Sequence, residues 1–204
     1  MGYSPCRHDD GNSVDCAYKS ASEVLAAFDR NRNDADIERL FLRNITDMTD
    51  DILAEILDIV STSASHKVHE IGLSVLPEVR EVPKSLMKFT NLESLYLEAM
   101  DKFKILPFGS IALPTNLTEI ICVFNHNLKL IESGAFQGIY MVRLNFADGK
   151  FQLCNNLGNF DGTDINLSFN GLKKFDEAVF KPLLSDSTAT IQFFFSETPT
   201  FLFK

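Results

Sequence analysis

Apolar residues recur along the chain in one short pattern. An apolar residue is followed by two variable positions and then by two more apolar residues, which are separated by one position. Because alternate residues of a strand point to opposite faces, the last two apolar positions predict a short strand with one buried face. The pattern occurs at Ile37/Leu40/Leu42, Val68/Ile71/Leu73, Leu92/Leu95/Leu97, Leu117/Ile120/Cys122, Ile139/Val142/Leu144, Gly162/Ile165/Leu167 and Thr188/Ile191/Phe193.

The copies are evenly phased. Their starts lie 31, 24, 25, 22, 23 and 26 residues apart, and five of these six distances fall in the range of leucine-rich repeats. Asn125 follows the fourth strand where such a repeat places an asparagine that can bond turn amides. One repeat cannot bury its own apolar face, so stacked neighbours must complete it. The sequence therefore predicts an α/β leucine-rich-repeat solenoid over residues 37–195, a curved horseshoe with about seven repeats and a parallel concave sheet.

Residues 1–36 are predicted to cap the first repeat. Cys6 and Cys16 flank a turn-like DDGN segment, and SVDCAY reads as a strand, so a disulfide-closed hairpin is expected. Repeat arrays need such caps because their end coils expose an apolar edge. The other end differs, because residues 196–204 form a tail without cysteines.

Two helices are predicted in the N-terminal part. The first starts at the capping-box pair Ser20 and Glu23 and runs to about residue 30. The second lies in the long return of the first repeat, on the convex side, and is capped near Thr49 or Asp50. Later returns contain prolines, which favour extended or turn-like backbone instead: Pro83, Pro107 and Pro114.

Composition narrows the classes of function. The formal net charge of −9 argues against nucleic acid, because phosphate binding needs clustered Lys and Arg. No stretch of 18 apolar residues occurs, so no membrane span is expected. His69 and Glu70 begin a HExxH-like run, but Leu73 replaces the second histidine and the segment is a predicted strand. We expect no catalytic residues, no metal and no cofactor, and hence no enzyme.

Three sequons are candidate glycosylation sites: Asn44, Asn116 and Asn166. Asn44 and Asn116 fall at predicted strand ends, where a glycan reaches solvent, whereas Asn166 sits in the middle of a strand on the concave face. Cys122 replaces a core leucine, and Cys154 lies on the next return. They are expected to be separate buried thiols, with a bridge between them as the alternative.

The concave face changes character along the chain. Its outward positions are mostly charged in the first three repeats and apolar from the fourth onward. Contiguous apolar surface usually marks an interaction site, so we expect a partner to bind there. The predicted partner-binding residues are Tyr96, Ile121, Val123, Phe124, Tyr140, Met141, Phe146, Phe169, Phe194 and Phe195. One repeat position is held by a phenylalanine in four repeats, at Phe124, Phe146, Phe169 and Phe195. These side chains are expected to stack as a ladder along the concave sheet. The alternative is that each packs on the neighbouring loop.

The N-terminal Cys pair, GAFQGI at 134–139 and LSFNGLKKFDEAVFKPLL at 167–184 resemble extracellular leucine-rich-repeat proteins of arthropods. The chain is most similar to the non-catalytic subunits of Oplophorus-type luciferases and their relatives. The resemblance implies a secreted, non-enzymatic partner or scaffold protein. It also implies a Cys-rich C-terminal cap, which this sequence lacks.

These observations predict a secreted protein that binds another protein chain, or self-associates, through the concave face and the C-terminal edge. One alternative is an accessory subunit that stabilises a secreted enzyme such as a luciferase. Another is an intracellular leucine-rich-repeat adaptor, which an oxidised Cys6–Cys16 pair would argue against.

Overall fold

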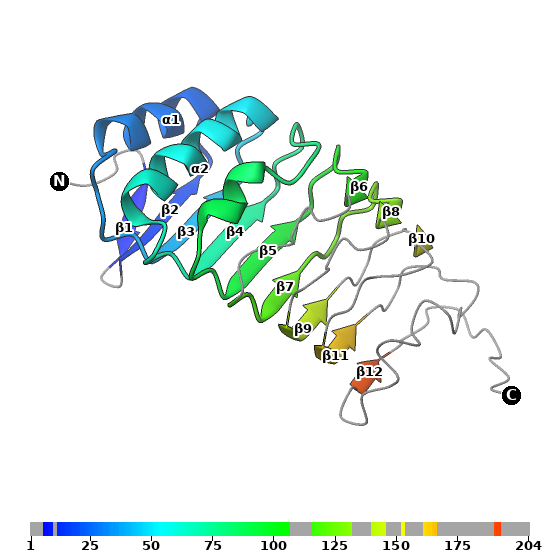
Figure 1. The fold of residues 1–204 in the computed structure, drawn as a ribbon. Coiled ribbons are helices and arrows are strands. Elements are labelled where there is room, and N and C mark those ends of the chain that lie inside the picture. Colours follow the sequence, from blue (N-terminus) through cyan, green and yellow to red (C-terminus); the bar gives the residue numbers. More distant parts are fainter. Residues whose placement is uncertain are drawn as a thin grey trace, which may run out of the picture.

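The structure of the chain is a computed structural model. It describes residues 6–9, 12–106, 116–131, 140–145, 152–153, 161–166 and 190–192, and the described side chains lie within residues 6–130. A nine-stranded sheet has the strand order β1-β2-β3-β4-β5-β7-β9-β11-β12 (Figure 1). Its strands are β1 (Arg7–Asp9), β2 (Ser13–Ala17), β3 (Arg39–Arg43), β4 (Glu70–Ser74), β5 (Ser94–Glu98), β7 (Glu119–Ile121), β9 (Tyr140–Asn145), β11 (Asp161–Asn166) and β12 (Thr190–Gln192). From β2 onward, neighbouring strands are parallel.

One register line crosses the large sheet from β2 to β12. It joins Val14, Leu40, Ile71, Leu95, Ile120, Leu144, Ile165 and Ile191. In six predicted repeats this residue is the second apolar position, as expected. In the fifth repeat the sequence placed Val142 there, and this was wrong by two residues, because Leu144 pairs with Ile120. The strand itself is present, but its repeat begins later than the sequence indicated.

Side chains on one face of the sheet form the core. The apolar positions of the first three repeats are all buried, as are those of the fourth, from Leu117 to Cys122. Strand β2 continues this core with Val14 and Cys16, so the cap behaves as a further coil. Burying one such side chain contributes about 1.5–3 kcal/mol, and stacking the coils sums these terms along the sheet.

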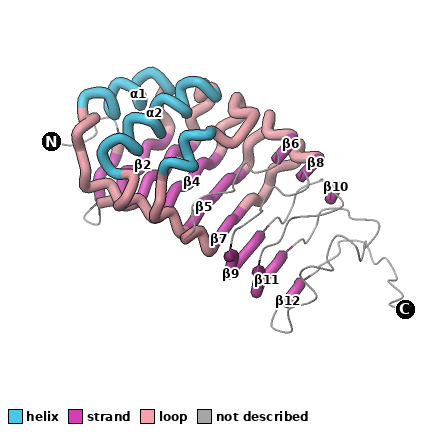
Figure 2. The backbone as a smooth tube through the Cα atoms, viewed as in Figure 1, coloured by secondary structure: helices cyan, strands magenta, loops and turns pink. Residues whose placement is uncertain are grey.

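Helices cover this face at the N-terminal end (Figure 2). Helix α1 (Ala21–Arg30) begins with the predicted capping box, in which the Glu23 N–H donates to Ser20 Oγ and the Ser20 N–H donates to the Glu23 carboxylate. Helix α2 (Asp50–Ala64) is capped by Thr49, whose hydroxyl oxygen accepts from the Ile52 N–H. Both helices therefore start where sequence patterns placed them.

Later returns are shorter and less helical. One contains a 3-10 helix, η1 (Lys84–Lys88), that follows Pro83, whose φ of −64° suits the start of a helical turn. The next returns carry short strands β6 (Ile105–Leu106), β8 (Leu130–Ile131) and β10 (Gln152–Leu153), which pair in parallel as a second sheet. No pattern in the sequence predicted this small sheet.

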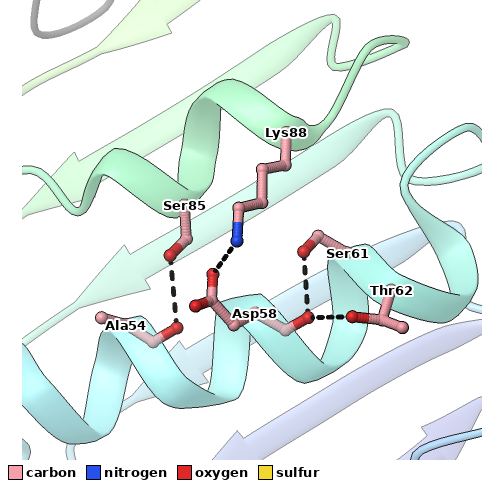
Figure 3. A network of polar contacts seen from close by, with 6 residues as sticks. All are labelled: Ala54, Asp58, Ser61, Thr62, Ser85 and Lys88. Atoms are coloured by element: carbon pink, nitrogen blue, oxygen red, sulfur yellow. Dashed lines mark hydrogen bonds and ion pairs between the residues drawn. The ribbon is translucent and has the colours of Figure 1, made fainter.

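Polar contacts join the returns of neighbouring coils. Figure 3 shows the link between α2 and η1, where Lys88 Nζ lies 2.7 Å from Asp58 Oδ1 and Ser85 Oγ donates to the Ala54 carbonyl. The hydrogen bond from Lys88 lowers the pKa of the Asp58 carboxyl. Since both ionic groups are about half exposed, this pair orders the returns more than it stabilises the fold.

The N-terminal hairpin carries the predicted disulfide. Strands β1 and β2 pair antiparallel, and Cys6 is bonded to Cys16, whose side chain is buried in the core. The bond ties the segment before β1 to the first core strand. The chain is thus an α/β protein with a parallel sheet, compatible with a solenoid-like fold, and its disulfide lies near the N-terminus.

Candidate functional site

The face of the large sheet opposite the helices is the candidate site, and no described helix covers it (Figure 1). We call it the open face. Its central row consists of one residue from each of five paired strands, Asp15, Phe41, Gly72, Tyr96 and Ile121. The Phe41, Tyr96 and Ile121 side chains are half-buried, so each still presents surface to solvent. Paired strands hold the row in fixed register.

Phe41 lies across the neighbouring strand. A Cβ atom built on Gly72 would stand 2.5 Å from Phe41 Cδ1, so the phenyl ring occupies the space that a side chain at 72 would need. The Arg43 guanidinium carbon lies 5.7 Å from the Phe41 ring centroid, within cation–π range. Arg43 also donates to both Asp15 carboxylate oxygens, with Nε 3.1 Å from Oδ1. Glycine at 72 therefore gives the open face a flat aromatic surface.

Tyr96 lies beside this surface on β5. Its hydroxyl donates to Glu119 Oε2 over 3.1 Å. Partial burial, followed by the Glu119 carboxylate and the charge of Glu70, raises the pKa of Tyr96 to about 12. The phenol therefore remains a protonated hydrogen-bond donor at neutral pH.

A row of residues in left-handed conformation borders the open face. Tyr18, Asn44, Val75, Ala99 and Phe124 each stand two residues after the last core position of a strand, with φ between 50° and 58°. We call this row the rim. The first four donate their N–H groups to a carbonyl of the next coil, for example Val75 to Glu98 over 2.9 Å. The rim thus hydrogen-bonds successive coils at the ends of the strands.

Apart from Asn44, the rim residues are unusual for this conformation. Left-handed backbone costs an L-residue roughly 1–2 kcal/mol, and β-branched or bulky residues are rare there. Nevertheless the exposed fractions are 79% for Tyr18, 51% for Phe124 and 36% for Val75. These side chains are too exposed for burial in the core to offset the cost of their left-handed backbone.

Asn125 follows the rim and has the role expected of the repeat asparagine. Its Oδ1 accepts from the Met100 N–H over 2.9 Å, and its Nδ2 donates to the Leu97 carbonyl over 2.7 Å. Nearby, the Cys122 thiol is free and buried, and burial raises its pKa well above the ordinary range. Cys122 thus packs as a core residue, while Cys154 lies outside the described residues.

The predicted partner-binding residues fall into three groups. Tyr96, Ile121 and Phe124 lie on the open face or its rim, as expected. Val123 was expected to face outward, and this was wrong, because only 7% of it is exposed. Strand β7 ends at Ile121, so strand alternation does not extend to Val123.

The other predicted partner-binding residues lie where side chains are not described. Tyr140 and Met141 begin strand β9, and only their backbone is described. Phe146, Phe169, Phe194 and Phe195 lie outside the described residues. The corrected register removes Phe146 from the predicted ladder, because counting from Leu144 gives it the repeat position of Cys122.

The sequons occupy different edges of the sheet. Asn44 is half-buried within the rim, while Asn116 is exposed just before β7 and donates to Asn91 Oδ1 over 3.3 Å. Asn166 ends strand β11 and pairs with Asn145 and Gln192. The placements of Asn44 and Asn116 agree with the predicted strand ends. Asn166 was expected in the middle of a strand, and this was wrong, because it is the last residue of β11. Glycosylation itself stays a prediction.

A shallow hollow of about 620 Å³ lies on the helix side, and three of its lining residues are Arg32, Glu55 and Asp58. Arg32 is paired with Asp29, and Asp58 with Lys88. Within the described part of the chain, no group of three or more His, Cys, Asp or Glu side chains is arranged for a metal. Nor does any helix in that part have the length and apolar character needed to cross a membrane. The open face therefore remains the better candidate site.

The sequence predicted Tyr96 and Ile121 as binding residues, but it did not predict the contributions of Phe41, Gly72 and the rim. Glycine in a strand is a known signal of close approach by another group, and it could have indicated the Phe41 ring. The rim had no such signal, because left-handed positions usually carry Gly or Asn. No protein-family model matches the chain, and no curated protein matches it either.

Proposed function

We propose that the chain is an extracellular leucine-rich-repeat solenoid whose open face binds another protein chain and carries no chemistry of its own. The register line and the buried apolar positions support the repeat assignment, since each strand contributes equivalent residues to one core. The disulfide supports an oxidising compartment, because such bonds persist mainly in secreted proteins.

The observation that carries the proposal is the contrast in cover between the two faces of the sheet. Helices and returns cover one face, while the other leaves Phe41, Tyr96 and Ile121 half-exposed on strands of fixed register. Aromatic and aliphatic side chains held rigidly lose little conformational entropy when a partner covers them. Exposed rim residues such as Phe124 extend this apolar surface at its edge.

Peptide selection followed by matched substitutions tests the proposal. Peptides would be selected from a random twelve-residue phage library on the immobilised full chain. The affinities of the selected peptides would then be measured for the double variant Ile121→Glu with Phe124→Glu and compared with those for the unchanged chain. The control is Ile105→Glu with Leu130→Glu, which alters two exposed apolar residues of the small sheet.

We expect the open-face pair to weaken binding at least tenfold and the control pair less than twofold, with both variants folded by circular dichroism. Selected peptides that lose affinity equally on both variants would contradict the proposal. The involvement of the C-terminal edge stays a prediction, because it concerns side chains beyond residue 130.

A further inference from the structure

The charges on the open face are unevenly distributed. Strand β3 carries Arg39 and Arg43, whereas β4, β5 and β7 contain no Lys or Arg and bear Glu70, Glu98 and Glu119. Glu119 accepts the Tyr96 hydroxyl. Glu70 and Glu98 are half-buried. Glu70 lies opposite Arg39 in the strand register, and the charge of Glu98 acts on the Arg43 guanidinium. Both arginines stand on β3, so the charged residues of β4, β5 and β7 are all acidic. This part of the open face is therefore anionic.

Strand register sets these carboxylates around Tyr96. Glu70 pairs with Ser94, Gly72 with Tyr96, and Ser74 with Glu98. Tyr96 thus has Glu70 in the row before it and Glu98 in the row after it. Rows on one face of a sheet are about 6.6 Å apart, twice the rise per residue. An extended Lys or Arg side chain can span that distance while its stem lies on the aromatic ring.

The neighbouring surface adds apolar contacts. The Phe41 ring covers Gly72, opposite Tyr96, and the exposed Val75 of the rim is hydrogen-bonded to the strand residue Glu98. Val75 is β-branched and left-handed, so its presence costs stability that its own burial does not return. A partner that covered Val75 would gain apolar contact there while its cations met the carboxylates.

From this charge complementarity we infer that the open face between β4 and β7 binds a polypeptide segment that carries Lys or Arg beside apolar residues. The inference rests on the proposed function and specifies its partner. Lys and Arg suit the site because their stems pack on Tyr96 and their cations pair with Glu70 and Glu98. An acidic segment would meet three carboxylates and no cation on these strands.

Synthetic peptides test the charge requirement directly. Fluorescein-labelled (Lys-Ser-Leu)₄, (Glu-Ser-Leu)₄ and (Gln-Ser-Leu)₄ would be titrated with the full chain at about 50 and about 300 mM salt. The test variant is Glu70→Gln with Glu98→Gln. Its matched control, Glu55→Gln with Glu81→Gln, removes the same charge from exposed residues away from the open face.

We expect the Lys peptide to bind at least tenfold more tightly than either other peptide at low salt. The test variant should weaken its binding at least tenfold, and the control less than twofold. Equal weakening by both variants would overturn the inference, because only net charge would then matter. Binding of the Glu or Gln peptide as tightly as the Lys peptide would overturn it as well. Should the double variant unfold, Glu98→Gln alone replaces it, with a threefold loss expected and no loss contradicting the inference.

The library peptides distinguish failure of this inference from failure of the proposed function. Library peptides that depend on Ile121 and Phe124 but not on Glu70 and Glu98 would leave the proposed function standing and overturn the partner chemistry. Library peptides that depend on neither pair would overturn both.

Discussion

The covered and open faces of the large sheet are built from the same strands, yet they differ in how their residues are chosen. On the covered face the first three repeats offer a leucine at one equivalent position, Leu42, Leu73 and Leu97, each fully buried. On the open face the central row holds a carboxylate, a phenyl ring, a glycine, a phenol and an isoleucine. Repeated residues are suited to stacking coils, while varied residues can distinguish partners.

The largest expected effect comes from breaking the covered face. Leu73→Ala should lower the free energy of unfolding by about 2–5 kcal/mol, because it leaves a cavity in a fully buried core. Its neighbour Ser74 is half-buried on the other face, so Ser74→Ala should change stability by less than about 0.5 kcal/mol. Urea unfolding followed by circular dichroism would measure both. Similar losses for the two variants would contradict the assignment of faces.

The next largest effect is expected from removing the disulfide that closes the hairpin at the N-terminal end of the covered face. Replacing Cys6 and Cys16 by Ser should cost about 2–4 kcal/mol, since the bond restricts the unfolded chain and Cys16 is itself buried. Thermal melting with and without a reductant would check this. If the reduced wild type melted like the oxidised protein, the hairpin would be held by packing alone.

The sequence could predict most of the covered face because its signals are local. Strand alternation, the Ser20–Glu23 capping box and the Thr49 cap each depend on residues a few positions apart. The Cys6–Cys16 pair also lies within one hairpin. For these features, neighbouring residues already contain the information that the fold uses.

The phase of the fifth repeat could not be predicted in the same way. The segment MVRLNF alternates whether its strand is counted from Val142 or from Leu144, so the local pattern fits two registers that differ by two residues. Pairing of Leu144 with Ile120 decides between them, and that pairing depends on the neighbouring coil. The same limit applies to the Phe ladder, which was inferred from the earlier phase.

The open face was harder to predict because its character depends on contacts between strands. A glycine within a strand signals that another group approaches it, but only the pairing of β3 with β4 shows that this group is the Phe41 ring. Val123 was placed outward by simple alternation, but the chain leaves the strand at Ile121 and reaches the left-handed Phe124. Strand ends, where backbone geometry changes, are where alternation fails as a guide.

A smaller, stabilising effect is expected at the rim. Val75→Asn should raise the free energy of unfolding by about 1 kcal/mol, because Asn tolerates left-handed backbone better than a β-branched residue. Asn already stands at the equivalent position in Asn44. Urea unfolding would measure the gain, with Ser74→Asn as the control on the adjacent strand position. A loss of stability would mean that Val75 contributes packing that outweighs its backbone cost.

The smallest expected effect is the pH dependence that Tyr96, on the open face, gives to the stability of the fold. Tyr96 has a pKa of about 12, above the usual 10.0, because burial and Glu119 disfavour the phenolate. A group whose pKa is raised on folding contributes stability below its unfolded pKa and loses that contribution as pH rises through the folded value. The contribution of Tyr96 should therefore be complete below pH 10 and decline between about pH 10 and 12. Absorbance of tyrosinate near 295 nm would follow the ionisation, and Tyr96→Phe should remove the late component while Tyr18→Phe, at an exposed rim position, should retain it. Loss of the late component in Tyr18→Phe instead would place the protected phenol at the rim and leave the hydrogen bond between Tyr96 and Glu119 without support.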